Sequence, residues 1–304
     1  MSVPPVEGAV SRNSYAGPLL VVEGSKLDAR LASGRDHDPG VEYFMMKYRD
    51  LLFPFFDVGA NVGLFTVHAA KLNEQGEVFA FEPHPTNAGL LRHNIDAYAL
   101  RNVRVWEVAT SSDDGFLSLG LAPSGMSVGS SVEKRQIAAR SLRSVIQETG
   151  VAPRFMKLDI EGAEMMALHG CLGSPGFMEC ILEMEFSWRD HRRSIGELHR
   201  IRPLDFYDYE FLLAADDLRA FERPLVSTEI EVGPSRRKVH SVVISNQHEW
   251  GALAEALQVR TVERGSRKWE CCITPRQMTR QPMISKVPVG GVERLDPIAL
   301  EYRG

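Results

Sequence analysis

The sequence predicts an α/β fold with a mostly parallel sheet, because short apolar segments alternate with longer amphipathic segments through the middle of the chain. A strand, a helix and a second parallel strand form a right-handed crossover, so this alternation indicates one sheet with helices on both faces. We expect seven strands, with an antiparallel strand at the end of the order. The predicted strands are 55–58, 77–81, 103–108, 154–158 and 179–186, followed by 209–214 and 239–245 as an antiparallel terminal pair.

Each element follows from a local pattern. Apolar residues recur at helical spacing over 41–52, and Pro54 ends that helix because proline lacks a backbone donor. The run 55–58 is apolar except for Asp57, which is typical of a buried strand. Four glycines between positions 111 and 140 indicate a hairpin and a loop. The helices expected between the strands are 61–73, 84–99, 161–170 and 194–201.

We expect a main domain at 39–247 with an appendage on each side. Residues 1–38 are rich in Pro, Gly, Ser and charge, so they predict a flexible arm or lid. Residues 248–304 predict a C-terminal helix and a basic extension, in which six Arg or Lys residues between 260 and 280 accompany two Glu residues. Such a segment is typical of a solvated tail or an oligomer contact, here a homodimer, and the alternative is docking of an anionic substrate or a carrier protein.

The composition argues against several classes of protein. In the 304 residues, Lys+Arg 35 against Asp+Glu 40 gives a net charge of -5, which offers no general attraction for nucleic acid. No apolar run approaches the roughly 20 residues of a membrane span, and the first residues lack a signal-peptide pattern, so we expect a cytoplasmic protein with no membrane partner. The four cysteines show no CxxC spacing and predict neither zinc nor disulfides.

The most specific motif is D-V-G-A-N-V-G at 57–63, where the first strand turns into a helix. Gly59 allows the tight turn, and Gly63 allows the helix to pack close to the sheet. A dinucleotide fingerprint requires G-x-G-x-x-G, whereas Asn61 stands where the second glycine would be. The spacing therefore argues against an NAD(P)-dependent oxidoreductase.

The acids around this loop fit S-adenosylmethionine, which carries no phosphate. Asp57 can pair with its ammonium directly or through water, the helix start can receive its carboxylate, and Glu82, after the next strand, can accept its ribose hydroxyls. The loop and the two acids together predict the cofactor site. From these patterns we expect Asp57, Gly59, Asn61, Gly63 and Glu82 to bind the cofactor.

Further acids predict the acceptor side of the site. Asp159 follows a strand, at the carboxyl edge where open α/β sheets bind ligands, whereas Glu161 and Glu164 open a helix and also complement its dipole. Glu185, or less favourably Glu183, lies near the end of the next strand. We hypothesise that Asp159 orients or deprotonates an acceptor hydroxyl, with Glu161 and Glu185 in support.

Two alternatives for the chemistry stay open. His191, just after the fifth strand, is an alternative base by location, although a histidine in a charged loop is more often simply solvated. Asp159, Glu161 and Glu185 are also suitable oxygen ligands for a magnesium ion, but their spacing does not require a metal.

Four segments resemble the FkbM family of class I S-adenosylmethionine-dependent methyltransferases. They are D-V-G-A-N-V-G at 57–63, A-F-E-P-H-P at 80–85, R-H-N-I at 92–95 and K-L-D-I-E-G-A-E at 157–164. The resemblance spans about 55–186 and implies a Rossmann-like class I methyltransferase fold, a cofactor site at the first two segments and a substrate side at the last. With this resemblance, the expected cofactor-binding residues also include Ala60, Pro83, His84 and Ala109. The chain departs from the family pattern at Arg143, where the family has an acid, and at His84.

The resemblance also implies O-methylation of a sugar, a polyketide or another specialised metabolite in natural product biosynthesis. N-methylation and a carrier-tethered acceptor are alternatives within methyl transfer. A non-catalytic scaffold is an alternative of another class, against which the intact Asp57, Gly59, Gly63 and Glu82 argue.

Overall fold

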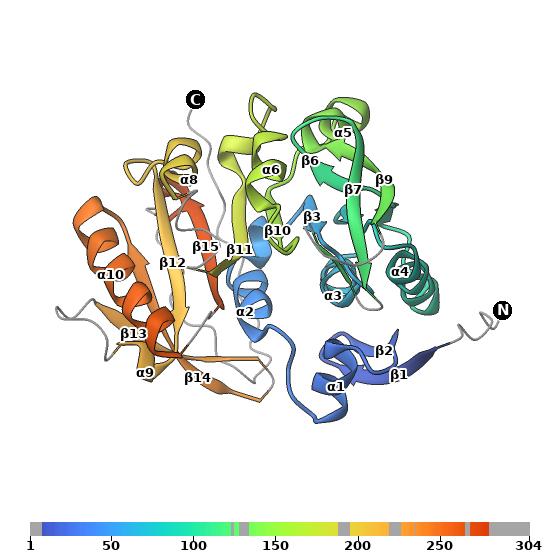
Figure 1. Cartoon of the computed structure of the whole chain (residues 1–304), viewed down its shortest axis with the longest axis horizontal. Helices are drawn as coiled ribbons and strands as arrows, with labels where there is room; N and C mark the ends of the chain where they lie inside the picture. Colours follow the sequence, from blue (N-terminus) through green and yellow to red (C-terminus); the bar gives the residue numbers. More distant parts are fainter. Residues whose placement is uncertain are drawn as a thin grey trace.

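A computed structural model describes residues 8–122, 125–127, 134–187, 195–218, 226–233, 235–264 and 268–279. The described residues form one large mixed sheet, a four-stranded sheet and a two-stranded hairpin (Figure 1). The large sheet has the order β13 (Ser227–Val232), β14 (Arg237–Ile244), β12 (Tyr207–Leu213), β15 (Lys268–Pro275), β11 (Ile181–Ser187), β10 (Phe155–Leu158), β3 (Phe55–Val58), β4 (Val78–Phe81) and β5 (Val103–Trp106).

The predicted α/β architecture is confirmed, but the seven-strand count is wrong for this sheet, which has nine. Strands β11, β10, β3, β4 and β5 pair in parallel, and β15 runs antiparallel between β11 and β12. The expected antiparallel pair is present as β12 and β14, and β13 extends it at the edge. Strand β13 was missed because its sequence, S-T-E-I-E-V, is that of a polar, half-exposed edge strand.

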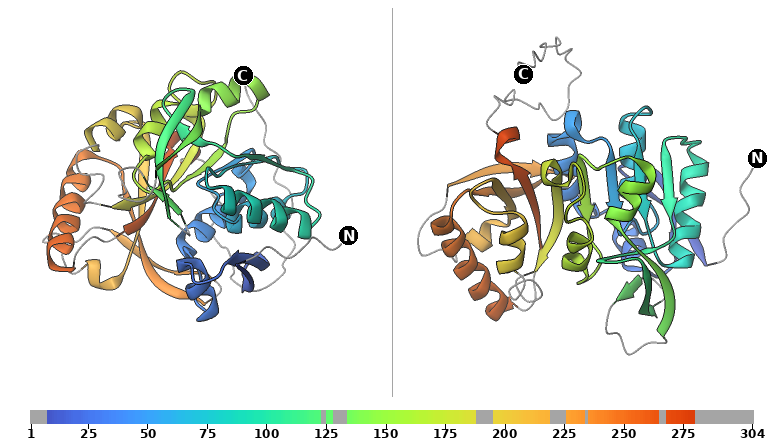
Figure 2. Two further views of the ribbon diagram at one scale, coloured as in Figure 1. Left: turned by 45° about the vertical axis from the view of Figure 1, so that its right-hand side comes forward. Right: turned by 90° about the horizontal axis from the view of Figure 1, so that it is seen from above.

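Helices cover both faces of the large sheet (Figures 1 and 2). The face that carries Phe55 and Phe155 is buried under α2 (Pro39–Lys47), α3 (Leu64–Leu72) and α4 (Pro85–Ala97). The face that carries Phe56 and Met156 is buried under α5 (Leu142–Thr149), α6 (Glu164–His169), α8 (Ile195–Ile201) and α10 (Gln247–Arg264). Adjacent strand residues thus enter different cores, as the two-residue repeat of a strand requires.

Among the described residues, regular structure is present from Ala9 onward, within the segment 1–38 that we expected to be a flexible arm or lid. Residues of the expected arm form β1 (Ala9–Ser14), β2 (Gly17–Val22) and α1 (Lys26–Ala32). Leu19 and Val21 are buried in the same core as α2 and α3. The Asn94 side chain in α4 accepts from the Leu20 backbone N–H at 2.8 Å and donates to the Leu20 carbonyl at 3.0 Å. The segment that composition marked as an arm is therefore docked onto the main domain.

The predicted end of the main domain at 247 is too early, because β15 (Lys268–Pro275) lies inside the large sheet. Cys271, Cys272 and Ile273 of this strand are buried between β11 and β12. Arg276, in the expected basic extension, donates to Asp208 at 3.0 Å and to the Asp205 carbonyl at 3.2 Å. At least this arginine has a structural role. Of the other basic residues in the extension, Arg267 and Arg280 lie outside the described residues.

The four-stranded sheet fills the region in which four glycines predicted a hairpin and a loop. Its order is β6 (Ala109–Ser111), β9 (Lys134–Ser141), β7 (Gly115–Ala122) and β8 (Gly125–Ser127). It lies beside the parallel strands, over the ends at which β3, β4 and β10 stop (Figure 1).

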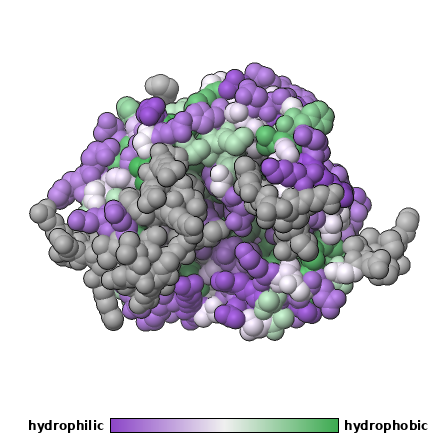
Figure 3. Space-filling view, in the orientation of Figure 1, coloured by the Kyte–Doolittle hydropathy of each residue, from purple (hydrophilic) through white to green (hydrophobic). Residues whose placement is uncertain are grey.

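Hydrophilic residues predominate over much of the molecular face seen in Figure 3. Within the part of the chain that the structure describes, no helix combines the length and the apolar character needed to cross a membrane.

Candidate functional site

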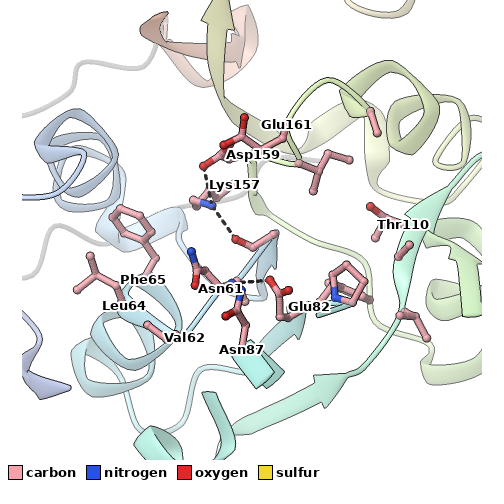
Figure 4. Close-up of a pocket in the computed structure, with 18 of the residues that line it drawn as sticks. Asn61, Val62, Leu64, Phe65, Glu82, Asn87, Thr110, Lys157, Asp159 and Glu161 are labelled. Atoms are coloured by element: carbon pink, nitrogen blue, oxygen red, sulfur yellow. Dashed lines mark hydrogen bonds and ion pairs between the residues drawn. The ribbon is translucent and has the colours of Figure 1, made fainter. Parts of the chain in front are cut away.

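A cavity opens at the carboxyl ends of β3, β4 and β10, the edge at which open parallel sheets bind ligands (Figure 4). Its volume is about 1040 Å³, including space at the mouth that is continuous with solvent. Each strand contributes the residues that follow it: Gly59 after β3, Glu82 after β4 and Asp159 after β10. Leu27 and His37 of the N-terminal segment line it too.

The loop after β3 can form only with glycine at position 59. Gly59 has a φ of 87°, in the left-handed region, and a Cβ atom there would lie 1.9 Å from the Asp159 carbonyl oxygen. The Gly59 and Ala60 N–H groups both donate to the Phe81 carbonyl at 3.0 Å. The loop is therefore fixed between the ends of β4 and β10.

Gly63 has a different packing role from the one predicted. It precedes α3 with a φ of 94°, and a Cβ atom there would lie 2.5 Å from Leu91 Cδ1. Gly63 thus permits close contact with α4, whereas we expected it to bring the helix close to the sheet.

Glu82 lies in the cavity lining, buried, with its carboxylate held by the backbone on both sides. Its Oε2 atom accepts from the Asn61 N–H and its Oε1 atom from the His84 N–H, each at 2.8 Å. Burial raises the pKa of Glu82 to about 7, although these two hydrogen bonds oppose the increase. Each oxygen keeps further acceptor capacity toward the cavity.

The remaining predicted cofactor residues divide into two groups. Ala60, Asn61, Pro83 and Ala109 line the cavity. His84 is not in the lining, and its Nδ1 atom accepts from the Thr86 N–H at 3.2 Å, where it caps α4.

Asp57 lies beneath the cavity and not in its lining. The side chain is fully buried, and its Oδ2 atom accepts from the Thr66 hydroxyl at 2.6 Å. Its Oδ1 atom lies 3.6 Å from the Lys157 ammonium. Asp57 is therefore placed to hold this lysine, and its pairing with a cofactor ammonium, directly or through water, stays a prediction.

Lys157 is a site residue that sequence reasoning missed. Its Nζ atom lies 3.8 Å from Asp159 Oδ2 and donates to the Gly59 carbonyl at 3.2 Å (Figure 4). Burial lowers the pKa of Lys157, but the charges of Asp57 and Asp159 outweigh it and leave the pKa above its ordinary value. The signal was a lysine in the middle of the buried strand F-M-K-L.

Asp159 and Glu161 line the same cavity as Glu82 (Figure 4). Glu161 has a φ of 54°, in the left-handed region, so the chain turns sharply between β10 and α6. The Glu164 Oε1 atom stabilises this turn by accepting from the Ile160 and Gly162 N–H groups at 3.2 and 3.0 Å. Glu164 is thus a capping residue, as its place in the first helical turn suggested.

Glu185 lies in a second, smaller cavity that also includes Asp159. The structure therefore brings Asp159 together with Glu161 in one cavity and with Glu185 in the other. In the described part of the chain, no group of three or more His, Cys, Asp or Glu side chains is arranged to hold a metal ion. His191 lies outside the described residues.

Other lining residues carried no recognisable motif. Most are apolar and come from α3, from the loop around β6 and from β7, so they shape the cavity by packing. They include Val62, Leu64, Phe65, Asn87, Val108, Thr110, Leu117, Leu119, Ile160 and Ala163.

Comparisons with known proteins converge on methyl transfer. The model of the methyltransferase FkbM domain matches residues 57–214. The chain is 25% identical to "Methyltransferase 1" of Beauveria bassiana (strain ARSEF 2860), over 38% of this chain and 56% of that protein. It is 33% identical to "Methyltransferase sdnD" of Sordaria araneosa, over 36% of this chain and 44% of that protein. The matched segments thus span about half the length of these curated relatives.

Among solved structures, the chain is similar to the methyltransferase FkbM from Methylobacillus flagellatus KT. The TM-score is 0.39 at 18% identity, and the match covers 62% of this chain and 43% of that one.

Proposed function

Since the chain belongs to the FkbM methyltransferase family, we propose that it transfers a methyl group from S-adenosylmethionine to a hydroxyl of a small-molecule acceptor. The observation that carries this proposal is that the loop after β3, Glu82, Asp159 and Glu161 all line the same cavity. A methyl donor bound at one end and an acceptor bound at the other would meet inside it.

The residues present fit this cofactor. The Glu82 carboxylate has acceptor capacity for two ribose hydroxyls, and it is held in place by two backbone N–H groups. The first turn of α3 borders the same cavity and begins with N–H groups that have no partner within the helix, which suits a carboxylate. The cofactor supplies an electrophilic methyl group on a sulfonium.

The rest of the chemistry falls to the chain itself. A neutral hydroxyl is a weak nucleophile, so a carboxylate that orients it or takes its proton accelerates the displacement. Asp159 lies at the cavity edge with Lys157 Nζ 3.8 Å from its Oδ2 atom. We assign the orienting or proton-accepting role to Asp159, and Lys157 positions it.

Cofactor binding tests the first half of the proposal. Calorimetric titration with S-adenosylhomocysteine should show one site per chain, and Glu82→Ala should weaken binding roughly 100-fold, since two hydrogen bonds to a charged group contribute about 3 kcal/mol. The matched control is Glu107→Ala, which removes a half-exposed carboxylate from the region after β5. Absence of binding to the unmodified chain would refute the proposal.

Turnover tests the second half. S-Adenosylhomocysteine release is measured against a panel of hydroxylated and aminated acceptors. With an active acceptor, Asp159→Asn should lower the turnover by roughly 10²-fold or more while cofactor affinity changes less than about threefold. Unchanged turnover in this variant would remove Asp159 from the chemistry, and activity with amines alone would favour N-methylation.

A further inference from the structure

The second cavity adjoins the first and is lined mainly by carboxyl groups. It has room for about one group the size of a water molecule, and Lys157 and Asp159 line both cavities. The small cavity lies where the start of α2 meets β10, β11 and β15. Its described lining consists of Asp38, Val41, Lys157, Asp159, Glu183, Glu185 and Glu270.

Glu183 is the least expected member of this lining. The register pairs Lys157 with Asp57 on one side and with Glu183 on the other, so the three side chains lie in a row on one face of the sheet. Glu183 is 1% exposed, and neither of its carboxyl oxygens has a hydrogen-bond partner. A buried carboxyl group without a hydrogen bond is costly, so its retention beside a cavity points to a ligand.

The nearest positive charge is already shared. Lys157 Nζ lies 3.6 Å from Asp57 Oδ1 and 3.8 Å from Asp159 Oδ2, and it donates to the Gly59 carbonyl, so its charge is divided among these groups. Burial raises the pKa of Glu183 well above its ordinary value despite this ammonium. Burial also raises the pKa of Glu270 to about 7, although Arg237 and Arg30 lower it. The nearby cations only partly offset the burial of these two carboxyl groups.

The start of α2 borders the small cavity and lies close to its carboxyl groups. A Cβ atom on Gly40, in the first turn of α2, would lie 2.8 Å from Glu270 Cγ. Asp38, the residue before α2, adopts a φ of 41° and adds another carboxyl group to the lining. The described lining thus combines five carboxyl groups with one lysine.

We propose that this small cavity binds a protonated amine of the methyl acceptor, with Glu183 as its principal partner. A cation offsets the excess of carboxyl groups and donates hydrogen bonds to the unpartnered Glu183 oxygens, whereas a neutral hydroxyl leaves the charge excess in place. The ammonium group itself is not methylated, because a protonated nitrogen has no lone pair. Its binding places the rest of the acceptor across Asp159, in the larger cavity.

This inference rests on the proposed function only where it identifies the bound amine as part of the methyl acceptor. Binding of a cation to the site can be tested without methyl transfer. Thermal unfolding is followed at pH 8 while ethylammonium chloride is added, with sodium chloride at equal ionic strength and ethanol as the neutral analogue. Ethylammonium should raise Tm along a saturating curve, by about 3 °C at tenfold its Kd. Neither sodium chloride nor ethanol should produce that curve.

Two variants locate the effect. Glu183→Gln keeps the shape of the side chain and removes its charge, so it should abolish the Tm shift caused by ethylammonium. Glu270→Gln should remove most of that shift. Both should fold, because glutamine keeps the shape of the glutamate side chain and carries no charge that burial would penalise. Glu179→Gln, an exposed position just before β11, should leave the shift intact.

The inference is overturned if ethylammonium gives no saturable shift, if ethanol or sodium chloride matches it, or if the shift persists in Glu183→Gln. Titration with S-adenosylhomocysteine in parallel samples reports the cofactor site independently. A chain that binds ethylammonium but not the cofactor would refute the proposed function and leave the cation site standing. A chain that binds S-adenosylhomocysteine but not ethylammonium would overturn the cation site and leave the proposed function standing.

Discussion

Replacement of Lys157 by methionine should be strongly destabilising, because this lysine is the cation beside a carboxylate that has no access to solvent. Asp57 is 0% exposed, and its Oδ1 atom lies 3.6 Å from Lys157 Nζ. Methionine nearly matches the volume of the lysine stem but leaves the Asp57 charge unpaired. Removal of one partner from a buried ion pair costs roughly 3–5 kcal/mol. For a chain of this size that corresponds to a Tm about 6–10 °C lower.

Thermal unfolding followed by circular dichroism measures this effect. The double variant Asp57→Asn, Lys157→Met should recover at least half of the loss, because it removes the unpaired charge as well. Lys238→Met is the control: its ion pair with Glu229 is shorter, at 2.8 Å, but both side chains are more than half exposed, so no measurable change is expected. A Tm for Lys157→Met within 2 °C of the unmodified protein would refute this account of the buried row.

Three further predictions concern the loop, Glu82 and the C-terminal strand. Gly59→Ala should weaken S-adenosylhomocysteine binding at least tenfold by calorimetry, since its Cβ would lie 1.9 Å from the Asp159 carbonyl oxygen, whereas Gly89→Ala, with open space around it, should not. Because the pKa of Glu82 in the folded chain is raised to about 7, its carboxylate becomes ionised as the pH rises from 6 to 8; cofactor affinity should increase over that range and be flat in Glu82→Gln. Truncation after Val259 removes β15 from between β11 and β12, so the product should be insoluble or lack a cooperative unfolding transition, and a folded, soluble product would contradict the observed sheet order.

The parallel half of the fold could be predicted from the sequence because its signals are local. The strands F-F-D-V and V-F-A-F are short apolar runs bounded by turns, and each is followed by a helix. Gly59 and Glu82 could be found in the same way, since each directly follows such a strand. The structure places both in the cavity lining.

In the antiparallel half, the pair β12 and β14 could be predicted, but β15 could not be placed because its signals are not local. Strand β15 is separated by 80 residues or more from β11, its neighbour in the sheet, and its two cysteines lie in a segment whose composition is basic. The docking of the N-terminal hairpin likewise depends on Asn94, 74 residues from the Leu20 backbone that it binds.

The buried row of Asp57, Lys157 and Glu183 likewise could not be predicted from local sequence. Asp57 and Lys157 are each the single polar residue of an apolar strand, and Glu183 lies in a strand that also contains Glu185. Only the register between the strands places the three side by side. Sequence reasoning therefore assigned Asp57 to the cofactor and left Lys157 without a role. In the structure, the Lys157 ammonium lies within 4 Å of both Asp57 and Asp159, so it connects the two carboxylates.

A crystal structure with S-adenosylhomocysteine bound tests the central claim most directly, namely that one cavity holds the methyl donor at Glu82 and the acceptor edge at Asp159. We predict both ribose hydroxyls within hydrogen-bond distance of the Glu82 carboxylate and the sulfur atom directed toward Asp159 and Glu161. A ribose bound away from Glu82, or a sulfur atom directed away from Asp159, would contradict the account.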